Sequence, residues 1–310
     1  MDTRPVTPVA RLGAAIVVVL GVTTLVFLLL HLVPGDPVEV MLGEYASAGD
    51  RAALSAALGL DRALAAQWSD FMAGLARGDL GVSLASGRPV ATLLAEHFAM
   101  TALLAAASLI VAMACGLPLG VLAALRAGRA WDTASTVLAV LAMSVPNFVL
   151  GPFLMLVFAV GLGWFPVGGA DSARALVLPA ATLGLSLAAL LARMTRAALL
   201  EELGRPYVLA ARARGLGEVR VVLGHALPNA ALPLVTTLGL QFGTLLGGAV
   251  VTETVFGWPG LGQLAVESIH RRDYPVVQGA VLLIALSYVV VNTLTDLLCA
   301  RLDPRLGGDR

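Results

Sequence analysis

The sequence predicts an all-α polytopic membrane protein with six transmembrane helices and both termini in the cytoplasm. Of its 310 residues, 58% are hydrophobic and 13% are charged, whereas about 25% of the residues in a soluble domain are charged. Six long stretches carry no charged side chain, and arginines are concentrated in the connections on one side of them. The net charge is zero, which excludes the basic surface that nucleic-acid binding requires.

A helix needs about 20 apolar residues to cross a bilayer. The uncharged stretches that predict the six spans are Leu12–Leu30, Phe98–Leu125, Thr133–Ala170, Ala175–Ala192, Ala226–Thr252 and Tyr274–Thr295. The third stretch is long enough for two helices, but its tail Gly161–Ala170 favours turns, so we expect one span and an outer loop. The first stretch follows Arg4 and Arg11 as in a signal peptide, but no small-residue cleavage site follows, so we expect a retained anchor.

Arginine distribution predicts the orientation of these spans. With both termini inside, 13 arginines lie on the cytoplasmic side and 7 lie outside. Four of the outer arginines belong to the first outer loop, which is too long to influence orientation reliably, and without it the ratio is 13 to 3. The excess of positive charge inside places both termini in the cytoplasm.

Three parts follow along the chain: residues 1–33 as the cytoplasmic N-terminus and first span, 34–97 as a large external loop, and 98–310 as a core of five spans. This core includes a cytoplasmic loop at about residues 198–229. The external loop either packs on the membrane part or docks an external partner, and the sequence leaves both interpretations open.

Short helices are expected in the external loop. Asp50 can cap a helix that runs to Leu58, with Gly59 just past its end. A second, amphipathic helix is expected from about Asp61 to Ala76. Its apolar stripe contains Leu64, Trp68, Phe71 and Leu75. Pro89 suits the first turn of the helix that leads into the second span.

Residues for catalysis or metal binding are few. The chain contains no lysine, so it has no Walker A lysine with which to hold ATP. Metal-binding spacing is lacking among the histidines, and CxxC spacing is lacking among the cysteines, so we expect no metal site. These residues are His31, His97, His225, His270, Cys115 and Cys299. We therefore expect no catalytic residue, no cofactor and no enzyme activity in this chain.

Two other functional classes have weak support. The string Gly184-Leu185-Ser186 partly resembles an intramembrane serine protease motif, but Leu187 replaces the second glycine and helix packing is the better interpretation. An ion-coupled secondary transporter of polar solutes is the main alternative. Such a transporter would need carboxylates within the membrane, and the six stretches that predict the spans provide none.

The fourth connection, Arg193–Asn229, is long and rich in arginine. Pro206 can begin a short helix over Tyr207–Arg214, and Gly215 can end it with a positive φ. A second short helix is expected at Glu218–His225, and Pro228 marks the entry to the fifth span. This connection is either a loop that only sets topology or a rigid lever for a cytoplasmic partner.

The same connection resembles the EAA signature of permease subunits in bacterial ABC importers. The matching residues are Ala210, Ala211, Gly215, His225, Leu227 and Pro228. Leu209 stands where the signature has glutamate, and His225 where it usually has isoleucine, as in the dipeptide/oligopeptide/nickel branch.

Other strings resemble that branch in the same order along the chain. They are GVTTLVFLLLHLVPGDPV (Gly21–Val38), GDLGVS (Gly78–Ser83), GRPV (Gly87–Val90), GWFPV (Gly163–Val167), ETVFGWPGLG (Glu253–Gly262), RDYPVVQG (Arg272–Gly279) and DPR (Asp303–Arg305). The resemblance covers nearly the whole chain. It implies a type I ABC importer permease fold in the bacterial inner (plasma) membrane.

The resemblance also implies partners within the lipid bilayer and on both of its sides. A second homologous permease would complete the translocation pathway, two ATPase subunits would supply ATP and Mg²⁺ sites, and an external solute-binding protein would deliver the solute. Dipeptides, oligopeptides, glutathione, nickel chelates and sugars all remain open as substrates. The residues expected to couple to the ATPase are Tyr207, Ala210, Ala211, Arg212, Arg214, Gly215, His225, Leu227 and Pro228.

A second site is expected on the outer face, where glycines surround an aromatic residue. Its residues are Trp258, Pro259, Gly260 and Gly262. They predict either an elbow at the outer mouth of the pathway that contacts substrate or binding protein, or a tight turn with an interfacial tryptophan.

Overall fold

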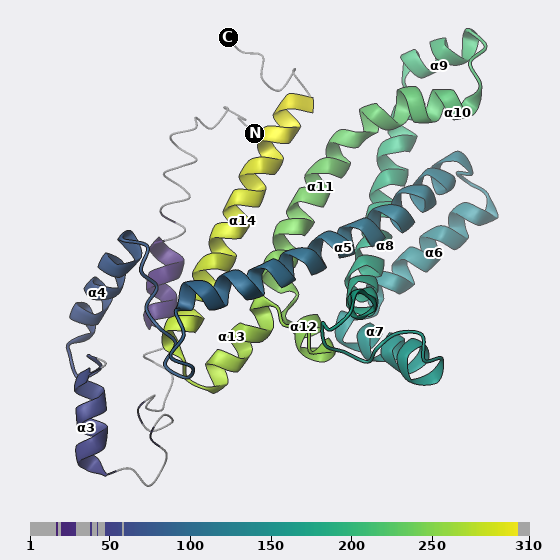
Figure 1. Cartoon of the computed structure of the whole chain (residues 1–310). Helices are drawn as coiled ribbons and strands as arrows, with labels where there is room; N and C mark the ends of the chain where they lie inside the picture. The colour runs from purple at the N-terminus through teal and green to yellow at the C-terminus, as the bar shows by residue number, and fades with distance from the viewer. Residues whose placement is uncertain are drawn as a thin grey trace, which may run out of the picture. The chain divides into compact units, whose positions relative to one another are not determined.

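A computed structural model describes residues 17, 20–28, 38, 42, 47–57 and 59–302. Within these residues the elements are helices, apart from one isolated β-bridge between Val82 and Pro89. The chain forms two compact units (Figure 1). Unit 1 consists of Met1–Thr101 and Pro259–Val289, and unit 2 of Ala102–Trp258 and Val290–Arg310.

The helices follow the chain from α3 to α14. Their bounds are α3 Ala48–Ala57, α4 Leu64–Ala76, α5 Val90–Leu125, α6 Ala130–Ser144, α7 Asn147–Leu154, a π-helix Met155–Gly161, a 3₁₀-helix Ala173–Leu176, α8 Val177–Leu203, α9 Pro206–Ala213, α10 Glu218–Val221, a π-helix Val222–Ala226, α11 Leu227–Gly248, α12 Val250–Phe256, α13 Leu261–His270 and α14 Tyr274–Leu302.

Four helices of the described chain are long and apolar enough to cross a membrane, and a bent pair makes a fifth candidate. The four are Val90–Leu125, Ala173–Leu203, Glu218–Gly247 and Tyr274–Arg301. About half of the first predicted span is described, namely Val17 and the stretch 20–28, and these residues are helical. His31, half of the string Gly21–Val38 (residues 29–37) and the string Asp303–Arg305 lie outside the described residues.

The third predicted span is a bent pair of helices and not one straight helix. Helix α6 ends at Ser144, and the pair Ala130–Ser144 and Asn147–Gly161 is bent by 98°. Val145 has an extended conformation (φ −88°, ψ 114°) because the ring of Pro146 disfavours the helical region for the preceding residue. The expected turn region after Gly161 is confirmed, since α8 begins only at Val177.

In unit 1, the cap of helix α3 differs from the one expected. Ser47 accepts the N–H of Asp50 on its hydroxyl at 3.1 Å, and that hydroxyl donates to the Asp50 carboxylate at 2.6 Å. Ser47 is therefore the capping residue. Asp50, three residues further along the helix, forms two hydrogen bonds with it, one through its backbone N–H and one through its carboxylate. The described helix ends at Ala57 and Leu58 lies outside the described residues, while Gly59 has φ +67°, as expected for a glycine just past a helix end.

Helix α4 agrees with the expected second helix. Phe71 stacks on Phe27 with ring centroids 6.1 Å apart, and the Trp68 indole N–H donates to the Thr24 hydroxyl at 3.3 Å. Two residues of the apolar stripe thus contact the helical segment 20–28. Within unit 1 this part of the loop that the sequence predicts to be external packs on the chain itself.

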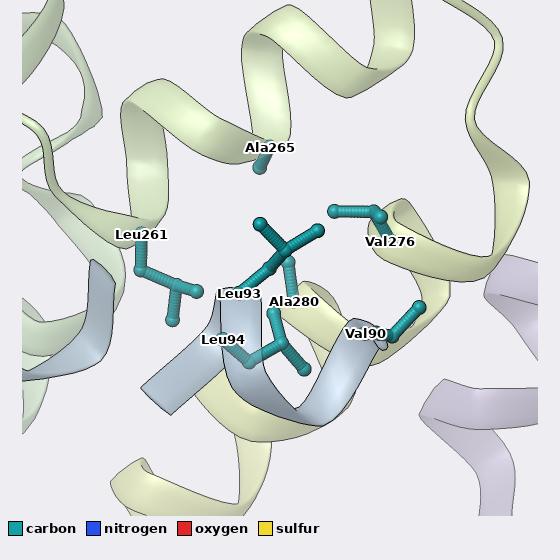
Figure 2. Close-up of a cluster of buried hydrophobic side chains, with 7 residues drawn as sticks. All are labelled: Val90, Leu93, Leu94, Leu261, Ala265, Val276 and Ala280. Atoms are coloured by element: carbon teal, nitrogen blue, oxygen red, sulfur yellow. The ribbon is translucent and has the colours of Figure 1, made fainter. Parts of the chain in front are cut away.

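A hydrophobic core joins the start of α5 to α13 and α14. Its buried residues are Val90, Leu93, Leu94, Leu261, Ala265, Val276 and Ala280. Figure 2 shows Leu93 projecting from α5 between Leu261 and Val276 toward Ala265. Gly279 allows this approach, because a Cβ there would lie 2.8 Å from a methyl carbon of Leu94.

Beside this core, a buried carboxylate holds two distant segments of unit 1 together. Asp273 accepts the Ser83 hydroxyl at 2.5 Å and the backbone N–H groups of Leu84 and Ala85 at 3.0 and 3.3 Å. Its side chain lies in the turn between α13 and α14. The strings GDLGVS and RDYPVVQG therefore meet in the fold, although 190 residues separate the two bonded side chains.

In unit 2, small residues bring α5 and α8 close together. A Cβ on Gly116 would lie 2.7 Å from the Ala188 carbonyl oxygen, and one on Gly120 would lie 2.5 Å from Cβ of Thr195. Gly184 would meet Cβ of Val111 at 2.6 Å, so the packing interpretation of this glycine is confirmed. Ser186 donates its hydroxyl proton to the Asn147 side-chain oxygen at 2.7 Å, which gives it no basic partner for nucleophilic chemistry.

Candidate functional site

Helices α9 and α10 form a compact knuckle between α8 and α11, at the end of unit 2 opposite α7 and α12 (Figure 1). Pro206 occupies the first turn of α9, and Gly215 follows its end with φ +79°. The Gly215 N–H closes the turn by donating to the Arg212 carbonyl oxygen at 2.9 Å. Both expected helix boundaries are therefore confirmed, since proline and glycine fix them through local backbone chemistry.

The second expected helix begins at Glu218 as predicted but does not end at His225. It continues through a π-helical turn, Val222–Ala226, into α11, so Pro228 lies inside a continuous helix and does not mark its entry. Proline lacks an N–H to donate within the helix, and beside it the Asn229 side-chain amide donates to the His225 carbonyl oxygen at 2.7 Å. The irregular turn thus accommodates the proline without a break.

One face of the knuckle packs against the unit's own core. This cluster contains Ala124, Leu199, Val208, Ala211, Val221, Val222 and Ala226. Ala211 is therefore buried, whereas its neighbour Ala210 is exposed. Of the other expected coupling residues, His225 and Leu227 are partly buried, and the exposed ones are Tyr207, Arg212, Arg214, Gly215 and Pro228.

The opposite face carries apolar side chains that sequence reasoning missed. Leu209 is 57% exposed, Val219 is 73% exposed and Leu223 is 53% exposed. In the sequence, Leu209 stands out only because it replaces the glutamate of the signature, and this gives no sign that its side chain is exposed. Exposed leucine and valine side chains on a segment otherwise rich in arginine are typical of surfaces that interact with another protein or with lipid.

The charges of the knuckle are partly matched within the chain. Arg212 donates to the two carboxylate oxygens of Glu218 at 2.6 and 3.2 Å, and this bond raises the pKa of Arg212 further. Burial, followed by its 2.6 Å bond to Glu202, raises the pKa of Tyr207. Within the described residues, Arg214 and Arg220 have no carboxylate at ion-pair distance. These two, and not Arg212, present unmatched positive charge.

The residues expected on the outer face form a tight turn between α12 and α13. Gly257 ends α12 in the left-handed region with φ 59°, and the Trp258 N–H donates to the Glu253 carbonyl oxygen at 2.8 Å. Trp258 is only 2% exposed; Gly260 and Gly262 are also buried, and Pro259 is partly buried. This burial supports the tight-turn interpretation, because an external protein could not reach the indole unless the turn opened.

Trp258→Ala should lower the melting temperature of the purified protein, because truncating a buried tryptophan costs about 3–5 kcal/mol. The measurement is a thermal unfolding curve in detergent, recorded together with uptake in cells. Trp164→Ala is the matched control, since Trp164 is 58% exposed, and it should leave the curve unchanged. Lost uptake with an unchanged melting temperature in Trp258→Ala would instead support a direct contact with substrate or binding protein.

Comparisons with known proteins identify the family of this chain. Residues 116–308 match the family described as "Binding-protein-dependent transport system inner membrane component", and residues 8–105 match the family of its N-terminal part. The chain belongs to this family. It is therefore a multi-pass inner-membrane permease of an ABC importer, and the ion-coupled alternative is not favoured.

Several curated relatives resemble this permease over almost their full length. The glutathione transport system permease protein GsiC of Shigella flexneri serotype 5b is 43% identical over 298 residues, covering 96% of this chain and 97% of the relative. The GsiC protein of Salmonella choleraesuis is 44% identical over 296 residues, with the same coverage. These identities support the peptide-type branch that the sequence strings indicated.

Solved structures support the fold of the permease. A native crystal form of the inward-facing MetNI methionine ABC transporter matches with a TM-score of 0.55 and 23% identity, covering 68% of this chain and 96% of that chain. A second crystal form matches with a TM-score of 0.58 and 24% identity over the same shares. The helical architecture is thus that of a type I ABC importer permease.

Proposed function

We propose that this permease forms half of the translocation pathway of an ATP-driven importer for glutathione or a related small peptide. The observation that carries the proposal is the 43–44% identity to glutathione permeases over 96% of the chain. An external solute-binding protein would deliver the solute, and a second homologous permease would supply the other half of the pathway. The solute would then cross as the two permeases rock between outward and inward states.

Two ATPase subunits would supply the energy, because the chain has no lysine with which to build a P-loop of its own. Their ATP and Mg²⁺ would remain in those subunits. The α9–α10 knuckle is the proposed coupling element. Its exposed Leu209, Val219 and Leu223 would fill an apolar groove, and the unmatched Arg214 and Arg220 would face acidic residues at the rim of that groove.

The same proposal includes six spans with both termini in the cytoplasm. The external part would be residues 34–97, the core would be residues 98–310, and the knuckle would lie inside the cell. The arginine ratio of 13 to 3 outside the long loop supports this orientation.

Thiol labelling should show the two loops on opposite sides of the membrane. In a chain whose Cys115 and Cys299 are replaced by alanine, Ser69→Cys should react with a membrane-impermeant maleimide in intact cells, because α4 is external. Ala213→Cys should react only after the cells are opened, because α9 is internal. Both native side chains are exposed, so accessibility does not limit either reaction. Labelling of Ala213→Cys in intact cells would refute the orientation.

The transport function is tested by reconstitution. Proteoliposomes containing the permease, its second permease, both ATPases and the binding protein should take up glutathione when ATP is supplied. A partner ATPase without its Walker A lysine is the matched control and should show no uptake. ATP-dependent uptake of unrelated solutes, but not of glutathione or small peptides, would overturn the substrate class while leaving the importer function intact.

A further inference from the structure

Two arginines one helical turn apart on α8 reach opposite ends of α6. Arg196 donates to both carboxylate oxygens of Asp132, at 2.5 and 2.7 Å, in the first turn of α6. Asp132 also accepts the Gly128 N–H at 2.9 Å. Arg193 instead donates to the sulfur of Met143 at 3.5 Å, in the last turn of α6.

These contacts place the two charges at different depths. Helix α6 rises about 1.5 Å per residue, so Met143 lies about 16 Å further along its axis than Asp132. Asp132 adjoins the arginine-containing connection before α6, at the membrane surface, whereas Met143 precedes the break at Val145 within the bent pair. Long side chains on a helix lean toward its N-terminus, which for α8 is the end away from α9. Arg193 begins the connection that follows the uncharged stretch, but its guanidinium is directed back into the span, toward Met143, and does not snorkel to the nearer surface.

Arg193 also lacks a counter-charge. Among the residues that the structure describes, no carboxylate lies at ion-pair distance from it, and its side chain is exposed. A charged side chain within a span is tolerated where it faces a water-filled cavity or a neutralising group. Asp132 is paired with Arg196 and lies about 16 Å along α6 from Met143, which Arg193 contacts, so it does not neutralise Arg193.

A cavity of about 260 Å³ between α5, α6 and α8 is bordered by Arg193. Its wall consists mainly of small apolar residues, with hydroxyl groups from Ser135, Thr136 and Ser186. The Ser135 hydroxyl donates to the Asp132 backbone carbonyl oxygen at 3.0 Å, and the Ser186 hydroxyl donates to the Asn147 side-chain oxygen at 2.7 Å. Arg196 borders the cavity too, but its charge is matched by Asp132, so Arg193 is the group at this cavity that offers an anion both an unmatched charge and free N–H donors.

We infer that Arg193 binds a carboxylate of the transported solute within the translocation pathway. The inference rests on the proposed function and names one residue that handles the substrate. A peptide carries a free carboxylate, and a guanidinium pairs with that group through two parallel hydrogen bonds. A phospholipid phosphate fits less well, because headgroups lie at the membrane surface and the guanidinium points away from it.

The first test compares glutathione with its diethyl ester, in which both carboxylates are blocked. Uptake is measured in proteoliposomes with the whole transporter. The uptake rate of each variant is divided by the rate of the native transporter for the same solute, so that the preference of the binding protein for one solute cancels. Arg193→Met should lower glutathione uptake by about 10-fold or more, the effect of one lost charge-assisted hydrogen bond. Ester uptake should fall much less, and Arg193→Lys should restore part of the glutathione rate.

Arg174→Met is the matched control, because Arg174 is an exposed arginine at the other end of the same span. It should leave the ratio of the two solutes unchanged. Equal losses of both solutes in Arg193→Met, or no loss of either, would overturn the inference. Loss of the second permease on copurification would overturn it too, since a partner carboxylate would then be the counter-charge.

The second test does not depend on the solute. In a chain with Cys115 and Cys299 replaced by alanine, Arg193→Cys should react with an anionic, water-soluble thiosulfonate in the assembled transporter. Reaction only with a lipid-soluble maleimide would place the residue against lipid and refute the inference while the proposed importer stands. A native transporter that moves neither glutathione nor its ester would instead refute the proposed substrate class.

Discussion

Gly215→Glu should abolish uptake and weaken copurification of the ATPase subunits, while membrane insertion and pairing with the second permease persist. Gly215 has φ +79°, where a Cβ costs roughly 1 kcal/mol. Among the described residues other than its two chain neighbours, no atom lies within 4 Å of an added Cβ at this position. The new side chain would therefore project from the tip of the knuckle, where it would meet only a partner. The large effect should come from separation of the two docking surfaces.

The matched control for this variant is Gly128→Glu. Gly128 has φ +75°, and an added Cβ there also meets no atom within 4 Å, but it lies in the α5–α6 connection. The backbone strain is thus the same, and only the position differs. We expect near-normal uptake and ATPase binding in Gly128→Glu, measured by pull-down from detergent and by uptake in cells. Normal binding and uptake in Gly215→Glu would mean that the knuckle only sets topology.

The boundaries of α9 could be predicted from the sequence because Pro206 and Gly215 act on the backbone locally. The bend at Pro146 was readable in the same way, since proline constrains the residue before it. Which of Ala210 and Ala211 is exposed could not be predicted from the sequence. It depends on packing against Leu199 and Ala124, which belong to helices distant in the sequence.

Charge pairing was likewise beyond the sequence pattern. Arg212 and Arg214 are two arginines of the same short segment, so the sequence does not tell which of them forms an ion pair. Within the described residues Arg212 pairs with Glu218, because the turn at Gly215 brings α10 back beside α9. The depth of Arg193 and the pairing of Arg196 with Asp132 depend on how α6 and α8 pack. Contacts of this kind are set by tertiary structure and leave no periodic signal in the chain.

Asp273→Ala should strongly destabilise the permease and, through that, remove transport. The carboxylate is 2% exposed and accepts the Ser83 hydroxyl and the N–H groups of Leu84 and Ala85. Removing it leaves the buried Ser83 hydroxyl without its acceptor, and the partly buried Leu84 N–H loses its acceptor as well, whereas water can reach the exposed Ala85. Each buried unsatisfied group costs about 1–3 kcal/mol, so the total loss should lie in that range or somewhat above it.

The measurement is the melting temperature of the purified permease, together with proteolysis of the segment before α5. Asp79→Ala is the matched control, because Asp79 lies in the same segment but is exposed and accepts only the Gly81 N–H, at 2.8 Å. Asp273→Asn should fall between the two, since its amide keeps one acceptor oxygen but turns donors toward the backbone N–H groups. If Asp273→Ala melted at the native temperature while transport was lost, the carboxylate would act on the solute or a partner, and its contacts with Ser83 and Leu84 would contribute little to the fold.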